Sequence, residues 1–225
     1  MNFSIYDAYN LRARLCVSIF LFSPILINLY LQIEEIKNIS TTTIIVISIV
    51  ALSNLSNIVI RKKAKESYAN KKRKYVCDYF FTNLDTMTRE RICSKLGKTG
   101  KKLSEFTESN DESYELMKSV LYQLKEVARK NDIVKEENIN YGFTRNLLSV
   151  KTIGIMINIL LILVQIVIYL SNLISSTIFL IVTAVDIFYL IIWIFYINEE
   201  LIKFSAYNYA EALFSAMNNP DIKKI

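Results

Sequence analysis

Asp186 is the residue of this chain whose type and position could most clearly do chemistry. Between 152 and 197 it is the only charged side chain in an otherwise apolar stretch. An ionised aspartate in the middle of a membrane-spanning helix costs roughly 2.5–3.5 kcal/mol on insertion scales, so we expect it to face a polar partner or water. Asn158 and Gln165 are seven residues apart in the same stretch and share one helical stripe. One hypothesis is that Asp186 from several subunits lines a cation-permeable pore. The alternative is a hydrogen bond with Asn158 or Gln165 that holds the bundle together.

Two more amide side chains, Asn54 and Asn57, lie near the end of an uncharged run at 41–60. Small and polar residues within a span often mediate contacts between membrane helices. Lining a pore is the other role that these residue types allow.

A second group of residues could bind an anion. Eight basic residues and one acidic residue lie between 61 and 74. Such a run can set membrane topology and contact anionic lipid headgroups, or it can bind the phosphates of a nucleotide or nucleic acid. The residues expected to contact such a ligand are Lys62, Lys63, Lys71, Lys72, Arg73 and Lys74.

Other kinds of site find little support in the sequence. The absence of histidine removes the most common general base and metal ligand. Cys16, Cys77 and Cys93 have no CxxC spacing, so we expect neither a disulfide framework nor a zinc site. Cys77 and Cys93 are expected to be reduced thiols of a cytoplasmic domain. The loop Gly-Lys-Thr-Gly-Lys-Lys at 97–102 resembles half of a phosphate-binding loop, but Ile92 stands where a P-loop has its first glycine. We expect no enzyme activity, cofactor or metal. A weaker anion site, made by backbone N–H groups and lysines of this loop, is the remaining alternative.

Four apolar runs must position these residues. A membrane helix needs roughly 20 apolar residues, and the stretch around Asp186 is long enough for two, with a break near Ser171 or Ser175. We therefore expect an all-α membrane protein whose four transmembrane helices form two hairpins flanking a helical cytoplasmic domain. The predicted spans are 15–32, 41–60, 152–170 and 176–197, with a cytoplasmic domain at 61–151 and a cytoplasmic helix at 198–225.

The distribution of charge predicts the orientation. Residues 61–151 hold 21 basic and 13 acidic residues and so carry +8, while the rest of the chain carries −2. Lysine and arginine accumulate on the cytoplasmic side of membrane proteins. We therefore expect 61–151 and both termini in the cytoplasm.

Within the cytoplasmic domain, a helix is expected to continue the second span from 61 to about 96, because no glycine or proline interrupts it. Another helix is predicted from Asn110 to about Lys130, since acidic residues follow Asn110 directly. Gly142 is expected to supply a turn in an elbow before the third span. The elbow residues are Tyr141, Gly142, Phe143 and Arg145.

The elbow sequence Glu-Glu-Asn-Ile-Asn-Tyr-Gly-Phe-Thr-Arg-Asn-Leu-Leu at 136–148 is similar to a motif of a family of bacterial four-span membrane proteins. The sequence Tyr-Asp-Ala-Tyr-Asn-Leu-Arg-Ala-Arg-Leu at 6–15 resembles the start of that family, and Tyr-Ala-Glu-Ala-Leu at 209–213 resembles its tail. The layout also resembles that of Hailong-type membrane channel effectors of anti-phage defence.

This resemblance implies a protein of the bacterial inner membrane that is controlled by a nucleotide or oligonucleotide, made by a nucleotidyltransferase encoded nearby. The function we expect is therefore a ligand-controlled ion channel or pore-forming effector, with the basic cytoplasmic domain as the binding part. Four spans can hardly enclose a wide pore alone, so a symmetric homo-oligomer is expected, with a tetramer as the working assumption. The alternative is a non-conducting membrane scaffold that recruits a cytoplasmic partner.

Overall fold

The structure is a computed structural model that describes residues 8–32, 71–124 and 130–218, together with 58, 60, 62–64, 66 and 68. The elements in these ranges are all helices. Three of the described helices are long and apolar enough to cross a membrane. The run 41–60, with Asn54 and Asn57, lies outside the described residues except at 58 and 60, so the four-span arrangement stays a prediction.

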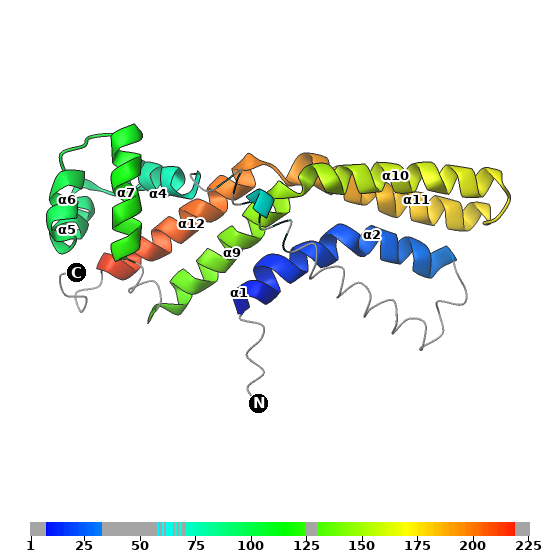
Figure 1. Cartoon of the computed structure of the whole chain (residues 1–225), viewed down its shortest axis with the longest axis horizontal. Helices are drawn as coiled ribbons and strands as arrows, with labels where there is room; N and C mark the ends of the chain where they lie inside the picture. The colour runs from blue at the N-terminus through cyan, green and yellow to red at the C-terminus, as the bar shows by residue number, and fades with distance from the viewer. Residues whose placement is uncertain are drawn as a thin grey trace, which may run out of the picture. The chain divides into compact units, whose positions relative to one another are not determined.

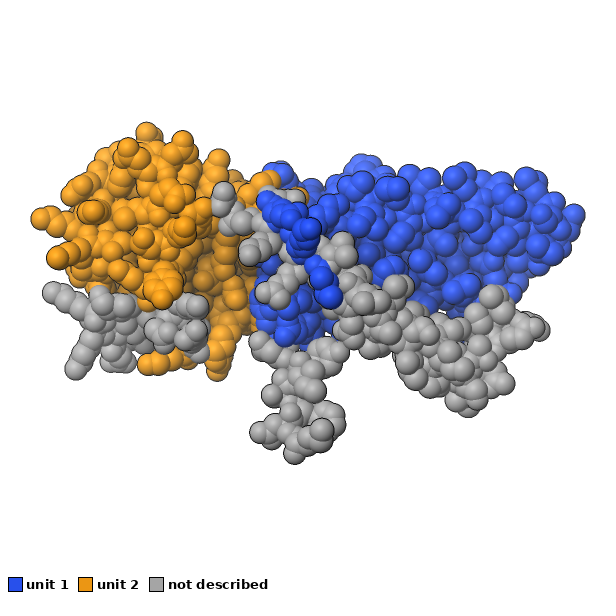
Figure 2. Space-filling view, in the orientation of Figure 1, with its two compact units in different colours: residues 1–67, 142–201 blue, residues 68–141, 202–225 orange. Residues whose placement is uncertain are grey.

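The chain divides into two compact units, which Figure 2 colours separately. Residues 1–67 and 142–201 form one unit, which holds the three apolar helices and is called the membrane unit below. Residues 68–141 and 202–225 form the other, called the basic unit. The division falls inside α9 (Asp132–Ser149) and α12 (Glu199–Asn218), so each of these helices contributes residues to both units.

The membrane unit is built from three apolar helical segments. The first consists of α1 (Ala8–Asn10), a π-helical turn η1 (Leu11–Leu15) and α2 (Cys16–Gln32). The other two are α10 (Lys151–Leu170) and α11 (Ser176–Ile191), the latter ending in a π-helical turn η3 (Ile192–Tyr196). α10 and α11 form an antiparallel hairpin, and α2 packs against both helices (Figure 1).

Three of the four predicted spans correspond to these segments, whose apolar stretches are Leu11–Gln32, Lys151–Leu170 and Ser176–Tyr196. The break between the last two lies at the predicted place. Asn172 adopts a left-handed conformation there, with φ 57°, which asparagine tolerates better than most residues. The side chain of Ser175 then accepts a hydrogen bond from the backbone N–H of Ile178 and caps α11.

The hairpin exposes large apolar side chains along its length. Leu160, Leu163 and Leu170 on α10 and Leu180 and Phe188 on α11 are each more than half exposed. Contiguous apolar surface of this kind is unfavourable in water and suits contact with lipid. The surface therefore agrees with a membrane protein, as composition alone predicts.

The basic unit is a small helical domain with its own core. Its helices are α4 (Lys71–Thr82), α5 (Thr86–Lys95), α6 (Gly97–Leu103), α7 (Asp111–Gln123) and the parts of α9 and α12 that belong to it. Phe80 of α4, Ile92 of α5, Leu103 of α6, Met117 of α7 and Phe214 of α12 are almost fully buried together. Burial of large apolar side chains from each helix is what holds these short helices in place.

The prediction of one helix from 61 to about 96 is wrong. α4 ends at Thr82 and α5 starts at Thr86. Asp85 has an extended backbone, and its carboxylate accepts a hydrogen bond from the Thr88 N–H at 2.8 Å. The hydroxyl of Thr82 bonds to the side chain of Asn83. Short polar side chains that bond locally compete with the helix and can end it without glycine or proline.

The prediction of a loop at 97–102 is also wrong, because these residues belong to α6. Gly97 has φ +58° and redirects the chain between α5 and α6. Gly100 lies so close to the backbone carbonyl of Cys93 that a Cβ atom would clash with it. The two glycines therefore allow a tight helix–helix junction, which differs from the phosphate loop that they suggest in sequence.

Gly142 does not form a turn either, since α9 runs through it without a break. A Cβ atom at this position would lie 2.6 Å from the hydroxyl oxygen of Tyr9, so the glycine allows the Tyr9 ring to approach the helix. The predicted start of the helix at Asn110 is confirmed, with Asn110 as the N-cap of α7. That helix ends at Gln123, before the predicted end at Lys130, and residues 125–129 lie outside the described part.

Candidate functional site

A buried polar cluster joins the three apolar segments of the membrane unit. The amide nitrogen of Asn28 donates to Oδ1 of Asp186 at 2.7 Å. Gln165 donates its own amide to Oδ1 of Asn28, also at 2.7 Å. Asp186 is fully buried, and Asn28 and Gln165 are each 2% exposed. One residue from each of α2, α10 and α11 thus meets in an apolar interior, where such bonds have no competition from water.

Pro24 shapes the part of α2 that presents Asn28. Proline has no N–H, so the carbonyl of Phe20 loses its usual helical donor. The hydroxyl of Ser23 lies 2.8 Å from that carbonyl and donates to it, and it also lies 2.8 Å from the hydroxyl of Tyr189 on α11. One turn later, the amide of Asn28 donates to the carbonyl of Pro24 at 2.8 Å. The local chemistry around Pro24 therefore links α2 to α11 at two adjacent levels.

Several oxygens in the membrane unit have no hydrogen-bond donor among the described residues. They are buried, and they belong to Asp186 (Oδ2), Gln165 (Oε1), Asn158 (Oδ1) and Thr183 (Oγ1). The amide nitrogen of Asn158 donates to the carbonyl of Gly154 at 2.7 Å, which leaves its oxygen available. Unpaired oxygens are costly in an apolar interior. Each of them can accept a hydrogen bond from a water molecule or coordinate a cation.

Trp193 closes one end of the packing between α2, α10 and α11. Its indole is fully buried and stacks at a tilt on Phe20, with ring centroids 5.3 Å apart. On the other side it lies against Gly154, where a Cβ atom would clash with the ring. The missing side chain at 154 therefore creates the space that the indole fills.

The polar residues predicted in the spans have different hydrogen-bond partners. Asp186 and Gln165 meet through Asn28, whereas Asn158 bonds within its own helix to Gly154. The sequence suggested that Asp186 bonds to Asn158 or Gln165; the structure pairs it with Asn28. Sequence reasoning missed Asn28, although an amide four residues after a proline in an apolar span is a signal that could have marked it.

The elbow residues are part of α9. Tyr141 is buried in the basic unit, and Gly142 contacts Tyr9 in the membrane unit. Arg145 donates to the side-chain oxygen of Asn146 at 3.3 Å. Asn146 is buried and donates to the backbone carbonyl of Ala13 at 2.7 Å, which fixes η1 to α9. Phe143 is half-buried.

The structure separates the predicted anion-binding residues into two groups. Lys62 and Lys63 belong to the membrane unit, and Lys71, Lys72, Arg73 and Lys74 lie on α4 in the basic unit. Arg73 pairs with Glu115 at 2.9 Å. Together with Lys71, Lys74 and Tyr114, these two residues line a cavity of about 350 Å³, to which Asp111 adds a second carboxylate. The lining therefore contains basic side chains that would attract an anion and carboxylates that would repel one.

Lys72 is engaged inside the basic unit. Its ammonium donates to the side-chain oxygen of Asn138 at 2.6 Å and lies 3.7 Å from the centre of the Tyr209 ring. The Tyr141 ring is also close, at 5.2 Å. Burial raises the pKa of Tyr209 to about 12, so this phenol stays neutral near pH 7. Lys72 thus joins α4, α9 and α12 through cation–π contacts and a hydrogen bond.

The thiols of the basic unit are not reactive groups. Cys77 and Cys93 are buried, and burial raises the pKa of each thiol from 9.0 to about 11. The thiolate is the nucleophilic form, and little of it exists at pH 7. Within the described residues, no group of three or more His, Cys, Asp or Glu side chains is placed to hold a metal ion.

Comparisons with family models, with curated proteins and with solved structures give no match for this chain.

Proposed function

We propose that this chain is a subunit of an oligomeric membrane channel and that Asp186 attracts the permeating cations. The observation that carries the proposal is the buried carboxylate of Asp186, which has one oxygen bonded to Asn28 and the other without a donor among the described residues. Ionisable side chains within membrane spans are rare, and they commonly mark ion or proton pathways. The free oxygens of Gln165, Asn158 and Thr183 supply further ligands on the same two helices.

The proposed channel is a symmetric homo-oligomer of the bacterial inner membrane with both termini in the cytoplasm. The basic run at 61–74 supports this orientation. Control by an anionic nucleotide or oligonucleotide, and a role in anti-phage defence, are further parts of the proposal. They are supported by the resemblance of 136–148 to the bacterial four-span family and by Lys71, Arg73 and Lys74, which line a cavity of about 350 Å³.

One observation favours a second function, a membrane scaffold that conducts nothing. The bonds between Asn28, Gln165 and Asp186 tie three helices together. Buried polar contacts of this kind can serve helix assembly alone. Under this alternative, Asp186 is a structural residue and the basic unit binds a partner protein.

Potassium flux from proteoliposomes separates the two functions. The protein is reconstituted with a potassium-sensitive dye, and wild type is compared with Asp186→Asn and with Asp132→Asn, a matched change at an exposed position outside the spans. If Asp186 attracts cations, losing its charge removes about 1.4 kcal/mol or more and flux falls about tenfold. Oligomer size on gel filtration and flux of Asp132→Asn should not change.

Absence of flux from a stable wild-type oligomer, with and without short oligonucleotides, would contradict the channel and support the scaffold. Equal flux of wild type and Asp186→Asn would show that the carboxylate is not the permeation element.

A further inference from the structure

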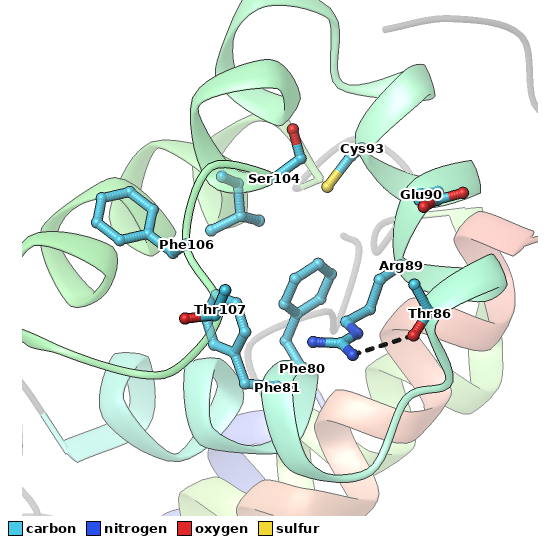
Figure 3. A pocket seen from close by; sticks show the side chains of 10 residues that line it. Phe80, Phe81, Thr86, Arg89, Glu90, Cys93, Ser104, Phe106 and Thr107 are labelled. Atoms are coloured by element: carbon cyan, nitrogen blue, oxygen red, sulfur yellow. Dashed lines mark hydrogen bonds between the residues drawn. The ribbon is translucent and has the colours of Figure 1, made fainter.

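The basic unit contains a cavity of about 290 Å³ that lies apart from the basic run of α4 (Figure 3). α4, α5, α6 and the loop after α6 supply its walls, which include Phe80, Phe81 and Phe106. Aromatic walls with a few polar groups are typical of small-molecule sites. The volume is near the lower limit of the usual range, ~300–1,000 Å³, so the cavity suits a ligand the size of one ring.

Arg89 gives this apolar cavity a positive group. The residue lies in the first turn of α5 and lines the cavity together with the phenylalanines (Figure 3). One terminal nitrogen donates weakly to the hydroxyl of Thr86, at 3.4 Å. The Nε atom is buried and has no acceptor among the described residues. A buried donor on a charged group is strongly unfavourable when left unpaired, and an anionic oxygen would satisfy it.

The surroundings favour an anion with an apolar body. A smaller cavity of about 230 Å³ adjoins the first one, shares Glu90, Cys93 and Ser104 with it, and adds Lys101 as a second cation. Glu90 is the one carboxylate in either lining, and it is exposed, so water screens its charge. The high pKa of the Cys93 thiol keeps that side chain neutral in the wall.

We propose that this cavity binds a small aromatic anion, a single ring carrying a carboxylate or phosphate. The ring lies against Phe81 and Phe106, which are partly exposed in the cavity wall, and the anionic group accepts hydrogen bonds from Arg89. The proposal depends on the proposed function only for its purpose, which would be to pass a ligand signal to the channel.

Calorimetric titration of the full chain in detergent micelles tests the site. Phenyl phosphate and benzoate are the probes. Inorganic phosphate, which has the anionic group without the ring, and phenol, which has the ring without the anionic group, are the controls. Saturable binding of phenyl phosphate or benzoate is expected. It should be at least about tenfold tighter than the binding of inorganic phosphate or phenol, because ring burial and a charged hydrogen bond each contribute to affinity. The relative affinity of the two probes distinguishes a phosphate ligand from a carboxylate ligand. Absence of saturable heat with both probes would overturn the proposal.

Two variants locate the binding. Arg89→Gln should weaken affinity about tenfold or more through loss of the charged donor. Arg91→Gln is the matched control, since this exposed arginine on the same helix bonds to Asn218 and lines neither cavity. Thr107→Trp, at an exposed position on the rim, should block the cavity without altering the core. Unchanged affinity in either Arg89→Gln or Thr107→Trp would place the ligand elsewhere.

Flux measured in parallel keeps the two proposals separate. Binding that has no effect on potassium flux would establish the site and contradict its role in controlling a channel. Ligand-dependent flux that survives Arg89→Gln and Thr107→Trp would support the channel and contradict this cavity as the site of control.

Discussion

Asn28 contacts both helices of the α10–α11 hairpin through one side chain. Its nitrogen donates to Asp186 and its oxygen accepts from Gln165. Replacing it with valine removes both of these bonds and also the bond to the carbonyl of Pro24. Side-chain hydrogen bonds within membranes contribute about 0.6 kcal/mol on average and up to about 1.7 kcal/mol, so Asn28→Val, which loses three, should lower the free energy of unfolding by about 1–2 kcal/mol.

Equilibrium unfolding in mixed micelles measures this loss. Leu29→Val, at the neighbouring half-exposed position, is the control and should change stability by less than about 0.5 kcal/mol. Equal stability of Asn28→Val and wild type would mean that the cluster does not hold the helices together.

Gly154 makes room for Trp193, the only tryptophan of the chain. Gly154→Ala places a methyl group against the indole, which must move, at a cost of about 1–3 kcal/mol. Fluorescence reports this directly: the emission of Trp193 should shift to longer wavelength as the ring leaves its buried position. Gly97→Ala, in the basic unit, should leave the emission unchanged, and an unshifted spectrum for Gly154→Ala would contradict the packing described here.

At the scale of single helices, capping explains where the basic unit's short helices begin. The Asn110 side chain accepts from the Ser113 N–H, and the Ser113 hydroxyl accepts from the Asn110 N–H, both at 2.8 Å. Asn110→Ala removes one half of this capping box and should cost about 1 kcal/mol. Thermal unfolding followed by circular dichroism measures the loss. Asn110→Asp keeps an acceptor and should stay near wild type; equal losses in both variants would show that capping is not the cause.

The titration of two buried thiols makes the stability of the basic unit depend on pH. The folded pKa of Cys77 and Cys93 is about 11 and the unperturbed value is 9.0, with burial as the main cause. The folded state therefore holds more protons between these values, and its stability must fall as pH rises from about 9 to 11.

Cys77→Ala combined with Cys93→Ala should reduce this slope. It is best measured by denaturant unfolding between about pH 9 and 10, because the buried Tyr209 adds its own pH dependence only from its unperturbed pKa of 10.0 upward. Cys16→Ala, in the membrane unit, is the control. An unchanged slope in the double variant would assign the pH dependence to other groups.

The sequence predicts some elements well and others poorly, for physical reasons. Apolar runs of membrane length leave few alternatives, and so three of the four predicted spans are found at their expected positions. The break between α4 and α5 was missed because Asn83 and Asp85 end the helix through local hydrogen bonds, with neither glycine nor proline present. Gly100 and Gly142 were read as loop residues because close packing against Cys93 and Tyr9 has no sequence pattern.

The candidate site was predicted in part. Asp186 and Gln165 stand out as polar residues in apolar runs, and both belong to the buried cluster. Their partner Asn28 is 158 residues from Asp186 in the chain, and no spacing rule connects residues on separate helices. Arg89 was missed for a similar reason, since its significance comes from the aromatic walls that α4 and the loop after α6 supply.

On the scale of the whole molecule, the chain combines a membrane unit that has a buried carboxylate with a basic unit that has cations in the walls of its cavities. This arrangement is compatible with the proposed channel, in which the membrane unit conducts ions and the basic unit binds an anionic ligand. In the proposed channel, Asp186 makes the pathway selective for cations.

The reversal potential of the reconstituted protein in a planar bilayer tests that claim most directly. Under a tenfold gradient of potassium chloride, ideal cation selectivity gives about 59 mV. We predict a potential that approaches this value with the sign of potassium selectivity, and a shift toward zero in Asp186→Asn. A potential near zero in wild type, or the same cation-selective potential in both proteins, would contradict the proposed role of Asp186.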